Sequence, residues 1–299
     1  MKIAITGGTG FIGKHLVKAL LKHEHEVYVL TRHPYEHYDE KVKYIEWLTE
    51  GSKPEDLLVG IDAFINLAGE PINNGRWTKK QKEKIIQSRR ETTREVLRIM
   101  EALPIPPSVF INASAIGYYN ASNEMNYTES STETGTDFLA NTVVEWETEA
   151  SKAEQLPLRV AYARFGIILG QDGGALPRMA LPYKFFIGGP VGSGRQWLSW
   201  IHIEDVCKAI IFILNHSIKG PVNIVAPNPL QMDEFGHILG QVIQRPHWLP
   251  VPSPVMKAVL GEMSTLVLDG QKVIPEVLLK NGFDFSYPTL KPALKDLLQ

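Results

Sequence analysis

The sequence predicts an α/β protein built on a doubly wound parallel sheet. Over the first 165 residues, short apolar segments alternate with longer amphipathic segments, a pattern typical of strands that alternate with helices. A glycine-rich turn directly follows the first apolar segment. The chain has 299 residues and a hydrophobic content of 44%, which allows one large domain, or one domain with a smaller appendage, each with its own core.

The expected strands are short and largely apolar, as strands covered on both faces should be. We place them at residues 2–6, 26–31, 42–47, 62–68, 108–114 and 158–165. The expected helices lie at residues 11–23, about 77–103 and about 136–154. A helix between successive strands gives a right-handed crossover, so the strands should pair in parallel with helices on both faces of the sheet.

The pattern changes in the second half of the chain. Residues 171–200 are rich in glycine and proline, which indicates an irregular segment that folds over another part of the protein. A strand and helix return at 200–216 and a further strand at 220–226, whereas the rest is mainly helical with frequent prolines. We therefore expect a nucleotide-binding domain formed by 1–166 plus about 201–226. A smaller, discontinuous, mainly helical substrate-side domain is expected at about 167–200 plus 227–299.

The first turn, ITGGTGFIG, carries the G-x-G-x-x-G spacing at Gly8, Gly10 and Gly13, and Gly7 extends it to a wider version. Glycine suits this position because the turn is tight, a pyrophosphate must approach the backbone, and the helix must pack close to the strand. The helix N-terminus then offers amide donors and a positive dipole to phosphates. The motif predicts a dinucleotide cofactor and a Rossmann-type sheet.

The end of the second strand bears on which dinucleotide is bound. An NAD site usually has an acidic residue there for the ribose hydroxyls, whereas this strand ends in Thr31, Arg32 and His33, with no acid before Glu36. Because Arg32 can pair with a 2′-phosphate, we predict NADP(H) over NAD(H). The alternative is that Arg32 is a solvated loop residue.

Composition favours a small-molecule partner. The formal net charge of −2 draws the protein neither to nucleic acid nor to anionic membrane, and the basic run at 77–98 is interrupted by Glu83, Glu91 and Glu95. The single cysteine, Cys207, excludes an internal disulfide. Since no segment resembles a signal peptide or a membrane span, we expect a soluble, cytoplasmic protein.

The nine histidines suggest no metal site. His33 and His37 have i, i+4 spacing in HPYEH, but Pro34 and the residues after it predict a loop without a third ligand nearby. His202 is interpreted as structural.

Several ordered motifs together resemble a known family. TGGTGFIG, NLAG at 66–69, SAIGY at 114–118 and WIHIEDV at 200–206 are similar to motifs of the extended short-chain dehydrogenases, also called the NAD-dependent epimerase/dehydratase family. The resemblance covers roughly residues 1–226. NLAGEPI, RW at 76–77, SR at 88–89 and SAIGYY further resemble the subgroup called epimerase family proteins, whose C-terminal domain of unknown function residues 250–299 resemble.

The resemblance implies a serine, a tyrosine and a lysine that cooperate, with tyrosine as the general acid or base. The serine is Ser114, but the helix expected to carry the other two has no tyrosine between 128 and 161 and only Lys152. Its candidate positions hold Asp137 and Asn141, or Leu139 and Val143. A Tyr-x-x-x-Lys pattern at residues 287–291 lies beyond the nucleotide domain and is treated as a coincidence.

Tyr118 and Tyr119 follow Ser114 closely enough to border the same pocket at the carboxyl edge of the sheet, so either could donate the proton. The alternatives are that both tyrosines pack the loop and that Ser114 only ends the strand. These three residues are the catalytic candidates.

The resemblance also implies the contacts of the ligands. The expected cofactor-binding residues are Gly7, Thr9, Gly10, Phe11, Ile12, Gly13, Thr31, Arg32, Leu67, Ala68, Gly69 and Arg164. The expected substrate-binding residues are Glu70, Arg76, Arg89, Arg195 and Trp197. The arginines could hold a carboxylate or phosphate, although a surface role is the alternative for each. The wider family implies a homodimer through the helices at 77–103 and 136–154.

The sequence therefore leaves three possible functions. The intact cofactor motif and Ser114 favour an NADP(H)-dependent oxidoreductase or epimerase-like enzyme. The missing tyrosine and lysine favour a protein that senses NADP(H) without turnover, and a protein that uses the cofactor as a scaffold is a third reading.

Overall fold

A seven-stranded parallel sheet forms the centre of the computed structural model, which describes residues 1–34 and 41–299. Its strand order is β11-β7-β5-β4-β1-β2-β3, and every pairing in it is parallel. The prediction of a doubly wound sheet is confirmed. The strands are β1 (Lys2–Thr6), β2 (Glu26–Thr31), β3 (Val42–Glu46), β4 (Ala63–Asn66), β5 (Val109–Ala115), β7 (Arg159–Phe165) and β11 (Gly220–Ile224).

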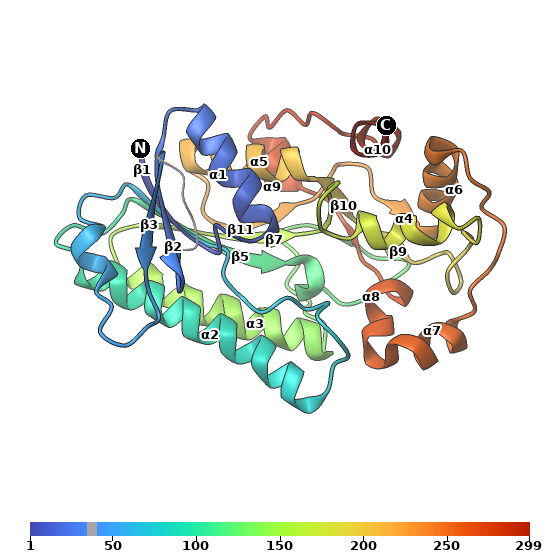
Figure 1. The fold of residues 1–299 in the computed structure, drawn as a ribbon, viewed down its shortest axis with the longest axis horizontal. Coiled ribbons are helices and arrows are strands. Elements are labelled where there is room, and N and C mark those ends of the chain that lie inside the picture. Colours follow the sequence, from blue (N-terminus) through green and yellow to red (C-terminus); the bar gives the residue numbers. More distant parts are fainter. Residues whose placement is uncertain (35–40) are drawn as a thin grey trace.

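Helices cover both faces of this sheet (Figure 1). One face is covered by α1 (Phe11–Lys22) and α5 (Ile203–Asn215), whose apolar sides pack against the sheet in one buried cluster. The other face is covered by α2 (Lys79–Ala102) and α3 (Phe138–Ala150). Each of these helices follows a strand and precedes the next strand of the sheet, which places successive crossovers on the two faces as expected.

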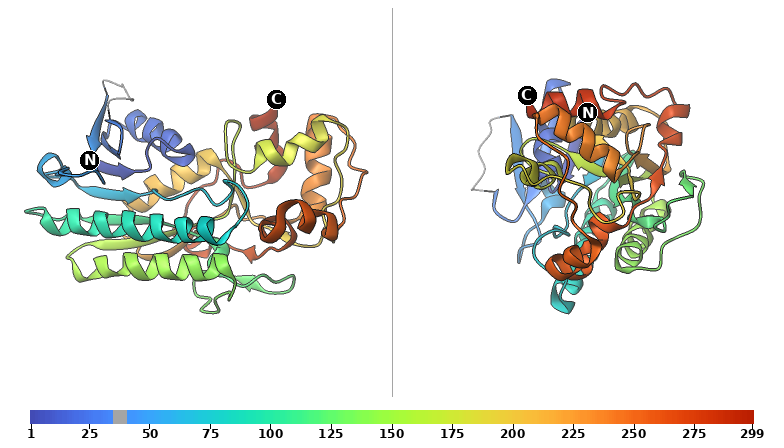
Figure 2. Two further views of the ribbon diagram at one scale, coloured as in Figure 1. Left: turned by 60° about the horizontal axis from the view of Figure 1, so that its bottom comes forward. Right: turned by 90° about the vertical axis from the view of Figure 1, so that its right-hand side faces the viewer.

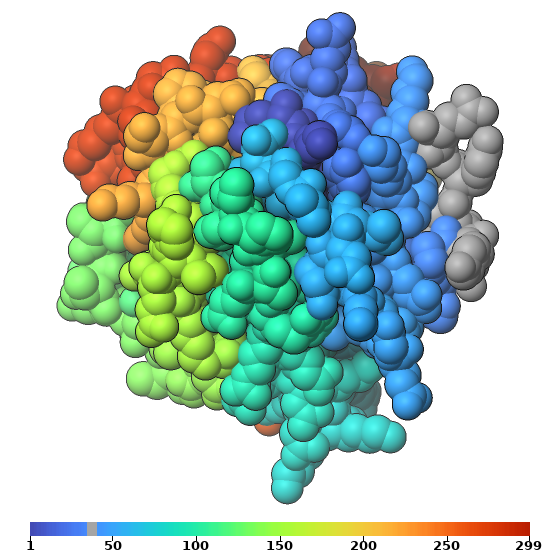
Figure 3. Space-filling view, turned by 90° about the vertical axis from the view of Figure 1, so that its left-hand side faces the viewer, coloured from blue at the N-terminus to red at the C-terminus, as the bar shows by residue number. Residues whose placement is uncertain are grey.

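The helices α2 and α3 lie side by side, and Figure 3 shows them together on one side of the molecule. Arg90 of α2 pairs with Glu145 of α3 at 2.8 Å, and Arg94 pairs with Glu149 at 3.1 Å. Cations of the basic run therefore face carboxylates of the same chain. The homodimer expected through these two helices stays a prediction.

A second set of elements gathers at the carboxyl end of the sheet (Figures 1 and 2). It contains three two-stranded pairings: β8 (Ile167–Leu169) with β10 (Trp200–His202), β9 (Trp197–Leu198) with β12 (Leu230–Gln231), and β6 (Asn126–Tyr127) with β13 (Lys272–Val273). The later helices are α4 (Leu176–Lys184), α6 (Met232–Ile243), α7 (Ser253–Leu260), α8 (Thr265–Leu268), α9 (Glu276–Lys280) and α10 (Leu290–Leu298). The 3-10 turns are η2 (Pro54–Leu57), η3 (Ile116–Tyr118), η4 (Ser151–Gln155) and η5 (Gly261–Ser264).

This second region has a hydrophobic core of its own. Buried residues of α4, α6 and α10 pack around Trp200 and Leu198. By contrast, Phe283 and Phe285 pack into the core of the main sheet. A discontinuous second domain is therefore our proposal for the part built around α4, α6 and α10, with the segment between α9 and α10 docked on the first domain.

Local capping explains where the helices begin and end. Thr78 accepts a hydrogen bond from the Gln81 amide, so α2 begins at Lys79 and not at 77. Asp137 caps α3 in the same way through the Ala140 amide. The helix predicted to reach 154 ends at Ala150 and continues as the 3-10 turn η4. The segment expected to be irregular, 171–200, contains the helix α4, which has proline at its start and at Pro182.

The segment 200–207 joins the two regions. His202 caps α5 by accepting the Glu204 amide at 3.1 Å, and its ring stacks on Tyr287 with 3.9 Å between centroids. Asp205 accepts the backbone amides of Ser286 and Tyr287 at 2.8 and 2.9 Å. Tyr287 therefore has a packing role at the base of α5. Burial raises the pKa of the Cys207 thiol to about 12, which fits a buried apolar residue.

Among the described residues, no helix is long and apolar enough to cross a membrane.

Candidate functional site

Two positions of the turn between β1 and α1 have room only for glycine. Gly7 has φ +68°, and a Cβ there would lie 2.7 Å from the backbone of Leu67. A Cβ on Gly13 would lie 2.1 Å from the Gly7 carbonyl oxygen. Gly10 caps α1 without a side-chain hydrogen bond to the first amides of the helix. The turn therefore presents helix amides at close backbone range, which is the geometry that a pyrophosphate needs.

The neighbours of the turn come from three segments. Phe11, at the start of α1, packs against Gly170 and Gly173, where a Cβ would meet its ring at 2.5 and 2.4 Å. The segment after β8 therefore lies over the glycine-rich turn. Thr9 and Ile12 are partly buried in the same turn.

Arg32 is exposed at the end of β2, one residue after the partly buried Thr31. Arg32 pairs with no carboxylate in residues 1–34 or 41–299. The exposed Arg32 thus lies at the end of β2, where the predicted contact with a 2′-phosphate would be made. Glu36 and His37, which entered the predictions about cofactor and metal, lie outside the described residues.

A row of buried polar side chains crosses the sheet beneath the turn. Thr6 donates to Asn66 Oδ1 at 2.6 Å, and Asn66 Nδ2 donates to Asn112 Oδ1 at 2.7 Å. All three side chains are fully buried and belong to neighbouring strands in register. The Thr6 hydroxyl also accepts the Ala68 amide at 3.3 Å. This row fixes the ends of β1, β4 and β5, and with them the segment Leu67–Gly69 beside Gly7.

Ser114 lies near the end of β5, directly across from Arg164 on β7. Its hydroxyl donates to Glu147 Oε1 of α3 at 2.5 Å. Arg164 holds the same carboxylate through both oxygens, with Nε and Nη2 at 2.8 and 2.7 Å. Ser114 is 2% and Arg164 is 4% exposed, so the ion pair is largely shielded from water. Burial disfavours the charged form of Arg164, but its hydrogen bonds to the Glu147 carboxylate raise the pKa of Arg164.

The two candidate tyrosines differ in their surroundings. Tyr119 is 1% exposed, and its hydroxyl donates to the Thr128 carbonyl or to Asn223 Oδ1 and accepts from Arg164 Nη1 at 2.9 Å. Burial raises the pKa of Tyr119. Tyr118 is half-buried, and the Arg164 guanidinium lies 3.6 Å from the centroid of its ring. Tyr118 is therefore the more exposed of the two tyrosines, whereas the buried contacts of Tyr119 hold the loop in place.

Arg164 lies within this network, and each of its three guanidinium nitrogens faces Glu147 or Tyr119. It was predicted as a cofactor contact. Its placement gives it a positioning role, since it orients Glu147 and supports the Tyr118 ring.

The helix α3 offers no replacement for the expected tyrosine and lysine. Asp137 and Asn141 bond to the backbone at the start of the helix, and Leu139 packs in an apolar cluster with Trp77. The residue of α3 that does face Ser114 is Glu147, which the sequence did not single out. The sequence did contain one signal for Glu147. It is an acidic residue on the face of the helix that also carries Val143 and Trp146, which are buried.

Two predicted substrate residues, Glu70 and Arg89, lie together. Arg89 Nη1 donates to the Glu70 carbonyl at 3.0 Å, and its side chain lies against Gly69. Burial lowers the pKa of Arg89 to about 10. The Glu70 carboxylate pairs with Lys84 at 3.1 Å. Arg89 thus holds the segment after β4 in place through Gly69 and Glu70.

The other three predicted substrate residues lie on separate segments. Arg76 donates to the Val259 carbonyl at 3.0 Å, which joins the loop before α2 to α7. Trp197 donates to the Asn123 carbonyl at 2.9 Å. Arg195 is exposed in the loop before β9.

The described residues also bring Asp233, His237 and His247 together, a group that the sequence did not indicate.

Residues 3–225 match the family model described as the NAD dependent epimerase/dehydratase family, and residues 251–297 match a domain of unknown function, DUF1731. Epimerase family protein YfhF of Bacillus subtilis is 47% identical over the whole of this chain and 98% of that protein. Epimerase family protein SA0724 of Staphylococcus aureus is 43% identical over 99% of this chain and 98% of that protein.

Solved structures show the same similarity. The human epimerase family protein SDR39U1, solved with NADPH, matches with a TM-score of 0.87 and 34% identity over 99% of both chains. The nucleoside-diphosphate sugar epimerase of Corynebacterium glutamicum matches with a TM-score of 0.76 and 29% identity over 99% of this chain and 58% of that chain. A UDP-glucuronic acid 4-epimerase of Bacillus cereus, 16% identical with a TM-score of 0.78, shares the fold.

Proposed function

This chain belongs to the NAD dependent epimerase/dehydratase family, and on that basis we propose that it binds NADP(H) and acts on a small molecule as an oxidoreductase or epimerase-like enzyme. The observation that carries the proposal is the β1–α1 turn, where Gly7 and Gly13 leave no room for a side chain. The relative solved with NADPH is 34% identical over 99% of this chain, which supports the choice of cofactor.

The residues present fit the cofactor. The amides at the start of α1 would hold the pyrophosphate, and Arg32 would pair with the 2′-phosphate that distinguishes NADP(H) from NAD(H). Leu67, Ala68 and Gly69 would border the cofactor from the end of β4. When bound, the nicotinamide supplies a hydride donor or acceptor.

Ser114 and Tyr118 are the residues that we propose for the substrate. Glu147, fixed by Arg164, accepts a hydrogen bond from the Ser114 hydroxyl and so orients the Ser114 oxygen. A substrate hydroxyl that donates to this oxygen would have a proton path through Ser114 to the carboxylate. The Tyr118 ring lies 3.6 Å from the Arg164 guanidinium, and we propose that its hydroxyl donates or accepts a proton at the substrate.

Turnover tests this proposal. NADPH oxidation is measured against aldehydes, ketones, quinones and nucleotide sugars, with the wild type and Ser114→Ala compared. We expect the variant to lose turnover and to keep its affinity for NADPH. Ser108→Ala is the matched control, because Ser108 is exposed at the opposite end of the same strand and should leave turnover unchanged. Equal turnover in Ser114→Ala would contradict the role of Ser114.

A sensor of NADP(H) without turnover is the second candidate, favoured by the absence of a tyrosine and a lysine from α3. Tight binding of NADPH with no oxidation across the panel, together with a large conformational change on binding, would favour it. Small-angle scattering with and without NADPH measures that change.

A further inference from the structure

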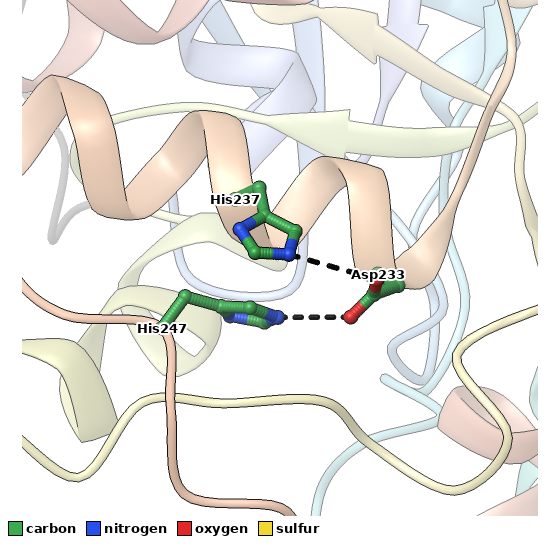
Figure 4. A group of neighbouring side chains, drawn as sticks. All are labelled: Asp233, His237 and His247. Atoms are coloured by element: carbon green, nitrogen blue, oxygen red, sulfur yellow. Dashed lines mark hydrogen bonds and ion pairs between the residues drawn. The ribbon is translucent and has the colours of Figure 1, made fainter.

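Three potential metal ligands converge at the end of the molecule farthest from β3. Asp233 and His237 lie one turn apart on α6, and His247 returns to them from the loop after the helix (Figure 4). The His247 Nε2 atom lies 3.0 Å from Asp233 Oδ1, and the His237 Nε2 atom lies 3.7 Å from Asp233 Oδ2. One donor atom from each residue lies within 4.8 Å of the other two.

This spacing is close to that of a metal site. With bonds of about 2.0 to 2.1 Å, two ligands of a tetrahedral zinc ion lie about 3.4 Å apart. The observed separations of 3.0 and 3.7 Å lie on either side of this value, and two of the three side chains are exposed. Those side chains are Asp233, 45% exposed, and His237, 58% exposed.

His247 is already held in place for such a role. Its side chain is 4% exposed, its Nδ1 lies 2.7 Å from the Tyr183 hydroxyl, and the two rings stack with an interplanar angle of 9°. A hydrogen-bond partner on the second ring nitrogen is what metal-binding histidines usually have. When the Tyr183 oxygen accepts from Nδ1, the Nε2 lone pair points toward Asp233.

The backbone of α6 leaves space for this arrangement. A Cβ at position 236 would lie 2.4 Å from His247 Cε1 and 2.6 Å from the Tyr183 hydroxyl. Gly236 therefore lets the imidazole and the phenol approach the helix directly. The position has an ordinary helical backbone, so the glycine is explained by the approach of these two groups.

A hydrogen bond between Asp233 and His247 would explain the position of the His247 ring, but it would not explain why the His237 ring lies beside them. The rings of His237 and His247 are 4.3 Å apart between centroids and both direct Nε2 at the same carboxylate. Two imidazoles and a carboxylate are ligands that zinc prefers. We propose that Asp233, His237 and His247 bind a Zn²⁺ ion, with the remaining coordination position open to water.

The ion would join two segments of the second region, because Asp233 and His237 lie on α6 and His247 lies in the chain that leads to α7. Asp233 also donates its amide to the Gly194 carbonyl at 2.9 Å, which anchors the loop that carries Arg195 at the same residue. The bound ion would therefore fix the connection to α7 against α6, next to this loop.

Zinc titration of the full-length protein, stripped with EDTA, tests the proposal by calorimetry. We expect the wild type to bind one equivalent of Zn²⁺. In His237→Ala, the affinity for Zn²⁺ should fall by about tenfold or more. Because His237 is exposed, this variant should fold normally. His15→Ala is the matched control, since His15 also faces a carboxylate, Asp172, at 3.0 Å but lacks a second histidine ligand.

A second measurement separates a built site from surface binding. Co²⁺ bound by the wild type should give the strong visible absorption of a tetrahedral site, and His247→Gln should lose it. Tyr183→Phe should keep the absorption but weaken binding by about tenfold, because the outer partner of His247 is lost. Unchanged Zn²⁺ affinity in His237→Ala, or a wild type that binds no zinc, would overturn the proposal.

Discussion

The Ser114 hydroxyl donates a 2.5 Å hydrogen bond to Glu147, and the same carboxylate is held through both oxygens by Arg164. The family uses a tyrosine and a lysine on the helix that here supplies Glu147. In this chain the charged residues next to Ser114 thus form a buried ion pair between α3 and β7. Proton transfer at Ser114 would therefore involve Glu147 or a group of the ligand, and Tyr118 is the partly exposed tyrosine beside Arg164.

The ion pair between Glu147 and Arg164 should matter for stability. Glu147→Gln leaves a buried guanidinium without its counter-ion, which should lower the free energy of unfolding by about 3 kcal/mol. Urea denaturation measures this. In Glu145→Gln, the control, an exposed pair with Arg90 is lost and the change should stay below about 1 kcal/mol. Equal losses in the two variants would show that the buried ion pair stabilises the protein no more than the exposed pair does.

The β1–α1 turn should tolerate no side chain at position 13. Gly13→Ala puts a methyl group 2.1 Å from the Gly7 carbonyl oxygen, so the turn must open and NADPH affinity should fall by about tenfold or more. Gly117→Ala is the control, because its Cβ would make only an ordinary 3.6 Å contact with Leu139. Fluorescence titration with NADPH compares them. A Gly13→Ala variant that binds like the control would rule out phosphate binding at this turn.

The two tyrosines after Ser114 should separate into a structural and a ligand-facing residue. Tyr119→Phe leaves buried partners of its hydroxyl unpaired and should cost about 1 to 3 kcal/mol in the free energy of unfolding. Tyr118→Phe should change it by less than about 0.5 kcal/mol, since its ring is only half-buried, but should lower turnover. Thermal melts and rate assays test both. The reverse pattern would assign the ligand-facing role to Tyr119.

Stability should fall in mild acid because of His202. Burial lowers the pKa of His202 in the folded protein, although Asp296, Asp205 and Glu204 oppose the shift. The unfolded chain takes up a proton near pH 6.5, so it binds more protons than the folded chain below that pH, and unfolding becomes easier.

Denaturation at pH 7.5 and 5.5 checks this, with a loss of up to about 1.4 kcal/mol assigned to His202. In His202→Asn the amide oxygen can still cap α5, but this titration is removed. The variant should therefore lose less stability between the two pH values. An identical loss in both proteins would exclude His202 as the cause.

The sequence was sufficient for the main sheet because its strands are short apolar segments separated by amphipathic helices, and β1, β2 and α1 lie within a residue of their predicted ends. The segment 171–200 was harder. Its prolines predicted a loop, whereas Leu176, Ala180 and Tyr183 form one apolar side of α4 that the second core covers. A propensity for irregular structure was overcome by packing that only the folded chain supplies.

The parts of the site that are formed by residues close together in the sequence could be predicted. The parts that are formed by residues far apart in the sequence could not. The glycine-rich turn could be found from its spacing, and Ser114 could be proposed from its place at a strand end and from the family resemblance. Glu147 could not, because its partner Arg164 becomes a neighbour of Ser114 only through the register of β5 and β7. His247 joins Asp233 only after the chain turns back from α6.

The preference for NADP(H) is tested by calorimetric titration with NADPH and with NADH. We expect the wild type to bind NADPH more tightly than NADH. In Arg32→Ala, NADPH affinity should fall by about tenfold to a hundredfold while NADH affinity stays nearly constant, because a charged hydrogen bond to the 2′-phosphate is lost. Lys219→Ala, which removes another exposed cation, should change neither. Equal affinity for the two cofactors, or a preference for NADH, would contradict the proposed NADP(H) site.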